Sequence, residues 1–246
     1  MEWHDEGLIL GTRKHGEASV IVEAMMRAHG RCFGLVRGGR PRPMQSLLQA
    51  GTKAEFVWRA RLDEHLGTFV VEPVSVPTAL MMASAEALHA VCHVAALLRQ
   101  GAERDPHPEL YEAAAQIAGR LDKPQDLASL MVHFEAEILA QMGFGLDLSV
   151  CAATGSRTDL IYVSPKSGRA VSKAAGEPYK ARLLPLPAFL LEGAREPNPP
   201  AAEICDGFRL TGFFLMRDLF EPRGQTLPDA RSAYLAAFVK RLGAAA

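Results

Sequence analysis

The chain has 246 residues, of which 48% are hydrophobic, 22% charged and 7% aromatic, and its formal net charge is −1. This composition excludes a mainly disordered chain and leaves enough length for a sizeable core or for two or three small modules. No apolar run approaches the roughly 20 residues that a membrane helix needs, and the acidic residues 1–6 lack the pattern of a signal peptide. We therefore expect a cytoplasmic protein whose four cysteines are reduced thiols.

The first 75 residues carry short β-branched and apolar runs separated by turn signals. We predict strands over residues 7–10, 19–24, 31–37, 52–61 and 66–74, with Gly11 closing the first of them. Residues 38–43 hold two glycines and two prolines, so we expect no regular structure there. Five short strands at this spacing are typical of a small closed barrel of the OB-fold type. We predict an OB-fold nucleic-acid-binding domain over residues 1–77.

After Pro77 the apolar residues recur at helical spacing, as Leu88, Val91 and Ala95 do. We predict helices over residues 79–100 and 105–121, from Pro124 up to Gly143, over 204–220 and from Pro228 to about 242. Between them, strands at 160–163 and 169–172 flank a Ser-Pro-Lys-Ser-Gly turn and predict a β-hairpin. The fold class is therefore a multidomain α+β chain, in which a helical domain over residues 78–246 holds a β-hairpin insertion at about 149–182.

Charge is distributed unevenly along the chain. Residues 27–61 carry eight basic residues and one acidic residue, a net charge of +7, and residues 151–182 carry a net charge of +4. Residues 62–150, which separate them, carry a net charge of −9. Such asymmetry indicates a localised polyanion site on an otherwise acidic protein.

The basic segment 27–61 is the strongest candidate for a binding site. Closely spaced cations repel one another unless an anion such as phosphate neutralises them, with release of counterions. Strand alternation places Arg31, Phe33 and Leu35 on one face, and Phe33, Phe56 and Trp58 are candidates for stacking on bases. The alternative is a solvated strand face with the aromatic side chains in the core, which is the commoner role for each ring. The predicted DNA-contacting residues are Arg31, Arg37, Arg40, Arg42, Lys53, Arg59 and Arg61.

The second basic segment supplies an auxiliary candidate. Lys166, Arg169 and Lys173 lie in or beside the predicted hairpin, where they would contact DNA or a protein partner. The alternative is a solvated hairpin whose charges balance the acidic helices, since surface ion pairs each contribute only about 0–1 kcal/mol.

Catalytic and metal-binding patterns are missing from the sequence. It contains no nucleophile elbow, no HExxH, no phosphate-binding loop and no GxGxxG motif. His89 and His93 share a helix face without a third ligand at any recognisable spacing, and Cys151 has no nearby cysteine or histidine. We expect no catalytic residue, no metal and no cofactor.

Several segments, taken together, resemble the RecO family of recombination mediators. They are residues 5–13 (DEGLILGTR), 15–19 (HGEAS), 29–31 (HGR), 36–40 (VRGGR), 143–148 (GFGLDL), 151–155 (CAATG) and 162–172 (YVSPKSGRAVS). Each motif alone is weak, but their combination in family order is specific and extends over most of the chain.

The resemblance implies an N-terminal OB-fold, a helical domain and a small cysteine-bearing insertion. It implies a non-enzymatic, nucleoid-associated role in bacterial DNA repair and homologous recombination by the RecFOR pathway. Members bind single- and double-stranded DNA, anneal complementary strands, bind the acidic tail of the single-strand-binding protein, and act with RecR to load RecA. Some hold zinc with four cysteines, of which only Cys151 remains here, so we expect a degenerate, metal-free, zinc-finger-like insertion. The alternatives are an OB-fold RNA-binding module and a protein-interaction adaptor.

Overall fold

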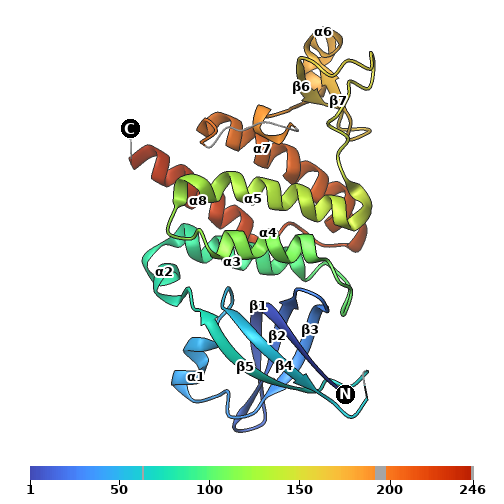
Figure 1. Cartoon of the computed structure of the whole chain (residues 1–246). Helices are drawn as coiled ribbons and strands as arrows, with labels where there is room; N and C mark the ends of the chain where they lie inside the picture. The colour runs from blue at the N-terminus through green and yellow to red at the C-terminus, as the bar shows by residue number, and fades with distance from the viewer. Residues whose placement is uncertain (63, 192–197, 245–246) are drawn as a thin grey trace. The chain divides into compact units, whose positions relative to one another are not determined.

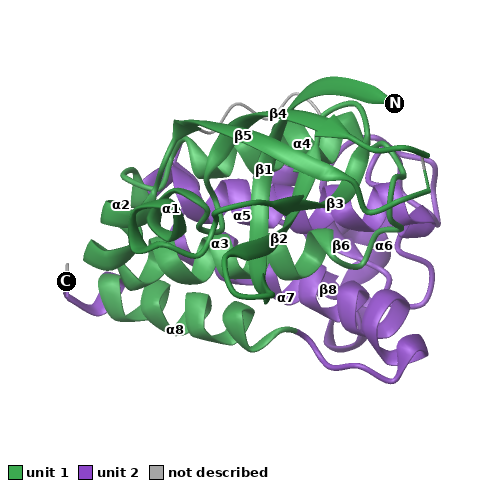
Figure 2. Cartoon of the chain, turned by 90° about the horizontal axis from the view of Figure 1, so that it is seen from below, with its two compact units in different colours: residues 1–124, 228–241 green, residues 125–227, 242–246 purple. Residues whose placement is uncertain are grey.

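The computed structural model describes residues 1–62, 64–191 and 198–244. It divides into two compact units, one formed by Met1–Pro124 with Pro228–Arg241 and the other by Gln125–Leu227 with Leu242–Ala246 (Figure 2). None of the described helices is long and apolar enough to cross a membrane.

The first unit begins with a closed five-stranded barrel (Figure 1). Its strands are β1 (Glu2–His15), β2 (Ser19–Met26), β3 (Gly30–Val36), β4 (Lys53–Arg59) and β5 (Thr68–Ser75). Around the barrel they follow the order β1-β2-β3-β5-β4, with β1 paired to both β2 and β4. A short parallel contact between β3 and β5, at Leu35 and Thr68, closes the barrel. The predicted OB-fold barrel is thereby confirmed.

Strand β1 is longer than predicted, and the prediction that Gly11 ends it is wrong. The register with β2 shifts between Ile9 and Gly11, and the strand then continues to His15. A β-bulge lets a strand bend without ending. A Cβ atom on Gly11 would lie 2.7 Å from the Arg99 guanidinium. The glycine therefore makes room for an arginine and does not mark a turn.

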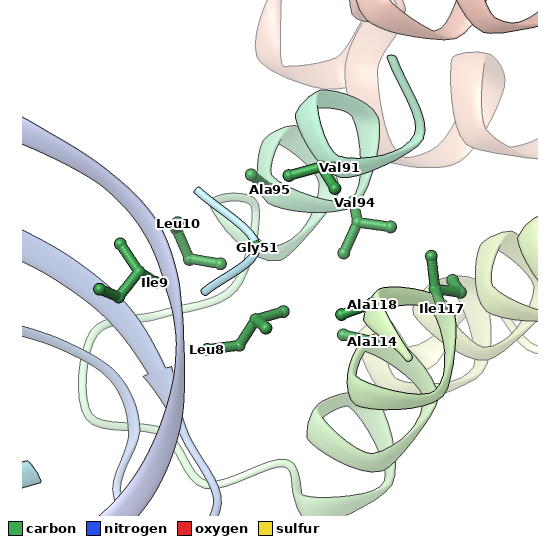
Figure 3. A pocket seen from close by; sticks show the side chains of 10 residues that line it. All are labelled: Leu8, Ile9, Leu10, Gly51, Val91, Val94, Ala95, Ala114, Ile117 and Ala118. Carbon is green, nitrogen blue, oxygen red and sulfur yellow. The ribbon is translucent and has the colours of Figure 1, made fainter. Parts of the chain in front are cut away.

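Both faces of β1 are buried where the apolar run Leu8-Ile9-Leu10 passes. Ile9 belongs to the barrel core, whereas Leu8 and Leu10 point the opposite way, toward two helices (Figure 3). Those helices are α3 (Ala85–Leu98) and α4 (Pro108–Ala118). A run of apolar residues without alternation is what a strand covered on both sides requires.

The helical part of the first unit departs from the prediction at two points. The single helix expected over residues 79–100 is divided into α2 (Thr78–Ala83) and α3, because Ser84 is extended and its hydroxyl accepts a hydrogen bond from the backbone N–H of Ala87. This is an N-cap, which starts a new helix. A short helix that was not predicted, α1 (Arg42–Leu47), follows Pro41 and lies between β3 and β4. The expectation of no regular structure over residues 38–43 is therefore wrong at its last two residues, because a proline fits the first turn of a helix. The last helix, α8 (Asp229–Ala244), buries Tyr234 and Phe238.

The second unit is built on α5 (Pro124–Leu139) and α7 (Ala201–Phe214), followed by a π-helical turn to Phe220. A Cβ atom on Gly207 would lie 2.8 Å from Val132, so the two helices pack closely at that point. The predicted hairpin is present as β6 (Leu160–Val163) and β7 (Ala170–Ser172). A third strand that was not predicted, β8 (Leu184–Pro185), pairs with β6 and completes a small sheet.

Candidate nucleic-acid interface

The outer surface of β1, β2 and β3 combines an aromatic ring with cations. Burial alternates along β3, so Arg31, Phe33 and Leu35 share the outer face as predicted. The guanidinium carbons of Arg13 and Arg31 lie 5.8 Å and 5.3 Å from the centre of the Phe33 ring. Both distances fall within the range of cation–π contacts. We call this surface, with Arg13, Phe33, Leu35 and Arg37, the basic face.

Phe33 is the only one of the three candidate stacking residues that lies outside the barrel core. It is partly exposed, whereas Phe56 and Trp58 are each 1% exposed and belong to the core. The core role expected as the commoner one therefore applies to Phe56 and Trp58.

Arg31 lies on the basic face, but its charge is already offset. It donates to the Glu23 carboxylate at 2.9 Å and to the Gly101 carbonyl at 3.2 Å. Glu23 also accepts from Arg99 at 2.8 Å. The two arginines thus fix the barrel to the segment around the end of α3, and Arg31 orients Phe33 from one side.

Two further predicted contacts on β4 are engaged in ion pairs across strands. Lys53 lies 2.9 Å from Glu6, and Arg59 donates to both oxygens of Glu2 at 2.8 Å and 3.2 Å. These hydrogen bonds hold the pKa of Glu6 and the pKa of Glu2 below their ordinary values.

Arg40 forms hydrogen bonds with the turn that joins β1 to β2. Its side chain donates to the carbonyls of Gly16 at 2.9 Å and Glu17 at 2.7 Å, and its backbone N–H donates to Ala18 at 3.2 Å. Four of the seven predicted contacts are therefore bound to groups of the barrel unit itself.

The other three, Arg37, Arg42 and Arg61, are exposed and form no ion pair within the described part of the chain. Sequence reasoning missed Arg13 and Lys14, which are exposed on the same hairpin, because the strand was expected to end at Gly11. The signal that would have located them is Gly16, whose φ of +60° marks the actual turn. From these exposed cations we select Arg13, Arg37 and Arg42 for the tests below and call these three the open cations.

The outer surface of β1, β4 and β5 has the opposite charge. Glu6 is paired in register with Glu55, and Glu55 with Glu72, so three carboxylates form a row across the strands. Like charges directly opposite each other are unfavourable. Only Glu6 has cationic partners within the described residues, namely Lys53 and Arg27. We therefore expect a polyanion to avoid this acidic face and to favour the basic face.

In the second unit, the three auxiliary candidates differ in their surroundings. Arg169 donates to Asp147 at 3.1 Å. Lys166, in the hairpin turn, and Lys173, at the start of α6 (Lys173–Gly176), are exposed and have no ion pair among the described residues.

Cys151 lies at the base of the same small sheet and is 1% exposed. Burial raises the pKa of its thiol, but hydrogen bonds from Ser172 and Thr154 outweigh burial and lower that pKa to about 6. Its Sγ accepts the backbone N–H of Ser172 at 3.2 Å. In the described part of the chain, no group of three or more His, Cys, Asp or Glu residues is arranged to hold a metal. The zinc-finger-like character of the insertion stays a prediction.

Comparison with known proteins agrees with both halves of this architecture. The family described as "Recombination protein O N terminal" matches residues 1–76, and "Recombination protein O C terminal" matches residues 82–226. The chain is 64% identical to a DNA repair protein RecO of Methylocella silvestris, over 98% of this chain and 97% of that protein. It is 56% identical to one of Beijerinckia indica, over 98% and 96%. The chain belongs to the RecO family, whose members act in DNA repair and recombination.

Proposed function

We propose that this protein is a non-enzymatic recombination mediator that binds single- and double-stranded DNA through the basic face. The observation that carries the proposal is the position of Phe33 beneath the Arg13 guanidinium, on a face that also holds the exposed Arg37. A phosphate chain meets cations there whose charge the barrel has not neutralised.

The arrangement suits strand annealing. Arginines that hold the backbone leave the base edges free to pair with a second strand. A single partly exposed ring can stack on one base without enclosing it, so each base is released easily as the duplex forms. The process makes and breaks no covalent bond, so it requires no catalytic residue and no cofactor.

The partners follow from membership of the family. We propose that the protein acts with RecR to load RecA on DNA coated by the single-strand-binding protein, whose acidic tail it contacts. Lys166 and Lys173 are the proposed auxiliary contacts for DNA or for that tail, because both are exposed and without ion pairs in the described residues. Binding to chromosomal DNA would keep the protein at the nucleoid.

The deciding experiment is the annealing of complementary oligonucleotides coated with the single-strand-binding protein. The wild-type chain should accelerate duplex formation, measured by fluorescence energy transfer between labelled strands. The variant with Arg13, Arg37 and Arg42 all changed to Ala should lose most of that acceleration.

A matched control removes the same charge elsewhere. Lys123, Arg209 and Lys240 are also exposed, and changing these three to Ala should leave annealing nearly unchanged. If both triple variants anneal equally well, the basic face is not the DNA site. If the wild-type chain accelerates nothing, the annealing function is wrong.

A further inference from the structure

A groove opens in the barrel wall where β3 and β5 separate. Its volume is about 410 Å³, and its walls include the side chains of Leu35, Met44, Val70 and Val71. Arg37 and Arg59 also line it. The groove is therefore mainly aliphatic, with two guanidinium groups.

The topology explains why this groove is present. β5 pairs with β4 along the strand, from Thr68 to Ser75, but with β3 in register only at Thr68. Beyond that point the edge of β5 that faces β3 has no strand partner in the described part of the chain. Helix α1, which lies beside β5 in Figure 1, contributes Met44 to the groove.

Val70 remains 56% exposed beside this edge. Because β3 and β5 run parallel from the pair Leu35 and Thr68, Arg37 lies two residues further along, at the level of Val70. An apolar wall and the Arg37 guanidinium, which has no ion pair among the described residues, thus face the same space.

We propose that the groove binds an extended segment of a partner protein, with apolar side chains at alternate positions and a carboxylate next to them. An unpaired strand edge binds an extended peptide through its backbone, and the pockets beside that edge select alternate side chains. Leu35, Val70 and Val71 supply the apolar pocket, and Arg37 supplies the carboxylate partner.

The chemistry of the groove favours a peptide over a nucleic acid. The one aromatic side chain among its lining residues, Phe69, is 3% exposed and packs in the core, so no ring face is offered to a base. The groove shares Leu35 and Arg37 with the basic face but includes neither Phe33 nor Arg13, and the inference does not depend on DNA binding.

The test begins with random twelve-residue peptides displayed on phage and selected against the immobilised full-length chain. The enriched peptides should alternate apolar with polar residues and carry Asp or Glu. Enrichment of basic sequences, or no enrichment at all, would overturn the proposal.

Variants then locate the site, with an enriched peptide made synthetically and labelled for fluorescence anisotropy. Val70→Gln removes the apolar wall without changing charge, and we expect it to weaken peptide binding at least about tenfold, as loss of a buried valine contact would. Val239→Gln is the matched control, because Val239 is 55% exposed on α8, and it should bind like the wild type. The two midpoints of thermal unfolding should agree, which confirms that both variants fold.

A second pair of variants distinguishes the peptide-binding site from the DNA-binding site. Arg13→Ala should weaken binding of a labelled oligonucleotide and leave peptide binding unchanged, whereas Val70→Gln should do the reverse. If Val70→Gln instead impairs only the oligonucleotide, the groove belongs to the DNA site and the proposal fails. It also fails if the enriched peptides bind the Val70→Gln variant as tightly as the wild type.

Discussion

The two outer faces of the barrel differ in how many of their cations form ion pairs with carboxylates. On the face of β1, β4 and β5, Lys53 and Arg59 each meet a carboxylate, and the Glu6, Glu55 and Glu72 row adds negative charge. On the face of β1, β2 and β3, only Arg31 is ion-paired within the described residues, and Arg13 and Arg37 stay open. We therefore expect a basic sequence segment to form a binding surface only where the fold leaves its charges without partners among the described residues.

The largest expected effect concerns the salt dependence of DNA binding. Removing the three open cations together should lower affinity for single-stranded DNA by orders of magnitude at low salt. It should also reduce the slope of log K against log salt by about 2, since each phosphate contact contributes roughly 0.7. Anisotropy titrations over a range of salt concentrations measure both. A double change of Lys53 and Arg59 to Ala, on the opposite face, should alter the slope by much less, and an equal loss there would show that the faces do not differ.

A smaller effect is expected in the second unit. Lys166→Glu together with Lys173→Glu should weaken binding of DNA or of the single-strand-binding protein tail several-fold without unfolding the chain. Arg169→Glu should instead lower thermal stability, because it places two carboxylates together at Asp147. If the Lys166→Glu and Lys173→Glu double variant binds both DNA and the tail normally, the hairpin segment has only a structural role.

The acidic row offers a test of stability. Glu55 lies opposite Glu6 and Glu72, so Glu55→Lys should replace two repulsions by two attractions. We expect the free energy of unfolding to rise by about 0.5–1 kcal/mol, measured by urea denaturation at low salt. The gain should shrink at high salt because exposed charges are screened. A gain that does not depend on salt would point to a cause other than charge.

The smallest expected effect is a shift in the pKa of one carboxyl group, that of Glu2. The hydrogen bond from Arg59 holds the pKa of Glu2 below its ordinary value of 4.5, so the ion pair favours folding above that pH and its contribution is lost as pH falls. Arg59→Ala should raise the pKa of Glu2 toward its ordinary value, which NMR titration of the side chain would detect. An unchanged titration would mean that the ion pair is not populated in solution.

The barrel strands were predictable because the apolar alternation and the turn glycines that define each strand are local in the sequence. Alternating burial along β3 follows directly from the apolar positions Cys32 and Val36 and the turn glycines on either side. The division of α2 from α3 was missed because the apolar spacing continues through the break, while the cap that causes it depends on the backbone of Ser84 alone.

The ion pairs were beyond sequence reasoning because they depend on strand register. Glu2 and Arg59 are 57 residues apart and meet only because β1 pairs with β4 at that position. Arg40 likewise meets two carbonyls whose positions are set by a turn far from it in sequence. The sequence identifies the cationic residues, whereas the register of the strands determines which of them form ion pairs with carboxylates.

The burial of Leu8 and Leu10 against α3 and α4 has a consequence for biosynthesis. The last barrel strand ends at Ser75 and α4 ends at Ala118. Translation proceeds at roughly 5–20 residues per second. The two leucines therefore stay exposed for about 2–9 s between synthesis of the last barrel strand and synthesis of the end of α4. During synthesis the barrel therefore exposes the apolar surface of Leu8 and Leu10 for seconds. A recombinant fragment limited to residues 1–77 would expose that surface permanently. Such a fragment should aggregate, whereas one that extends through α4 should stay monomeric for longer.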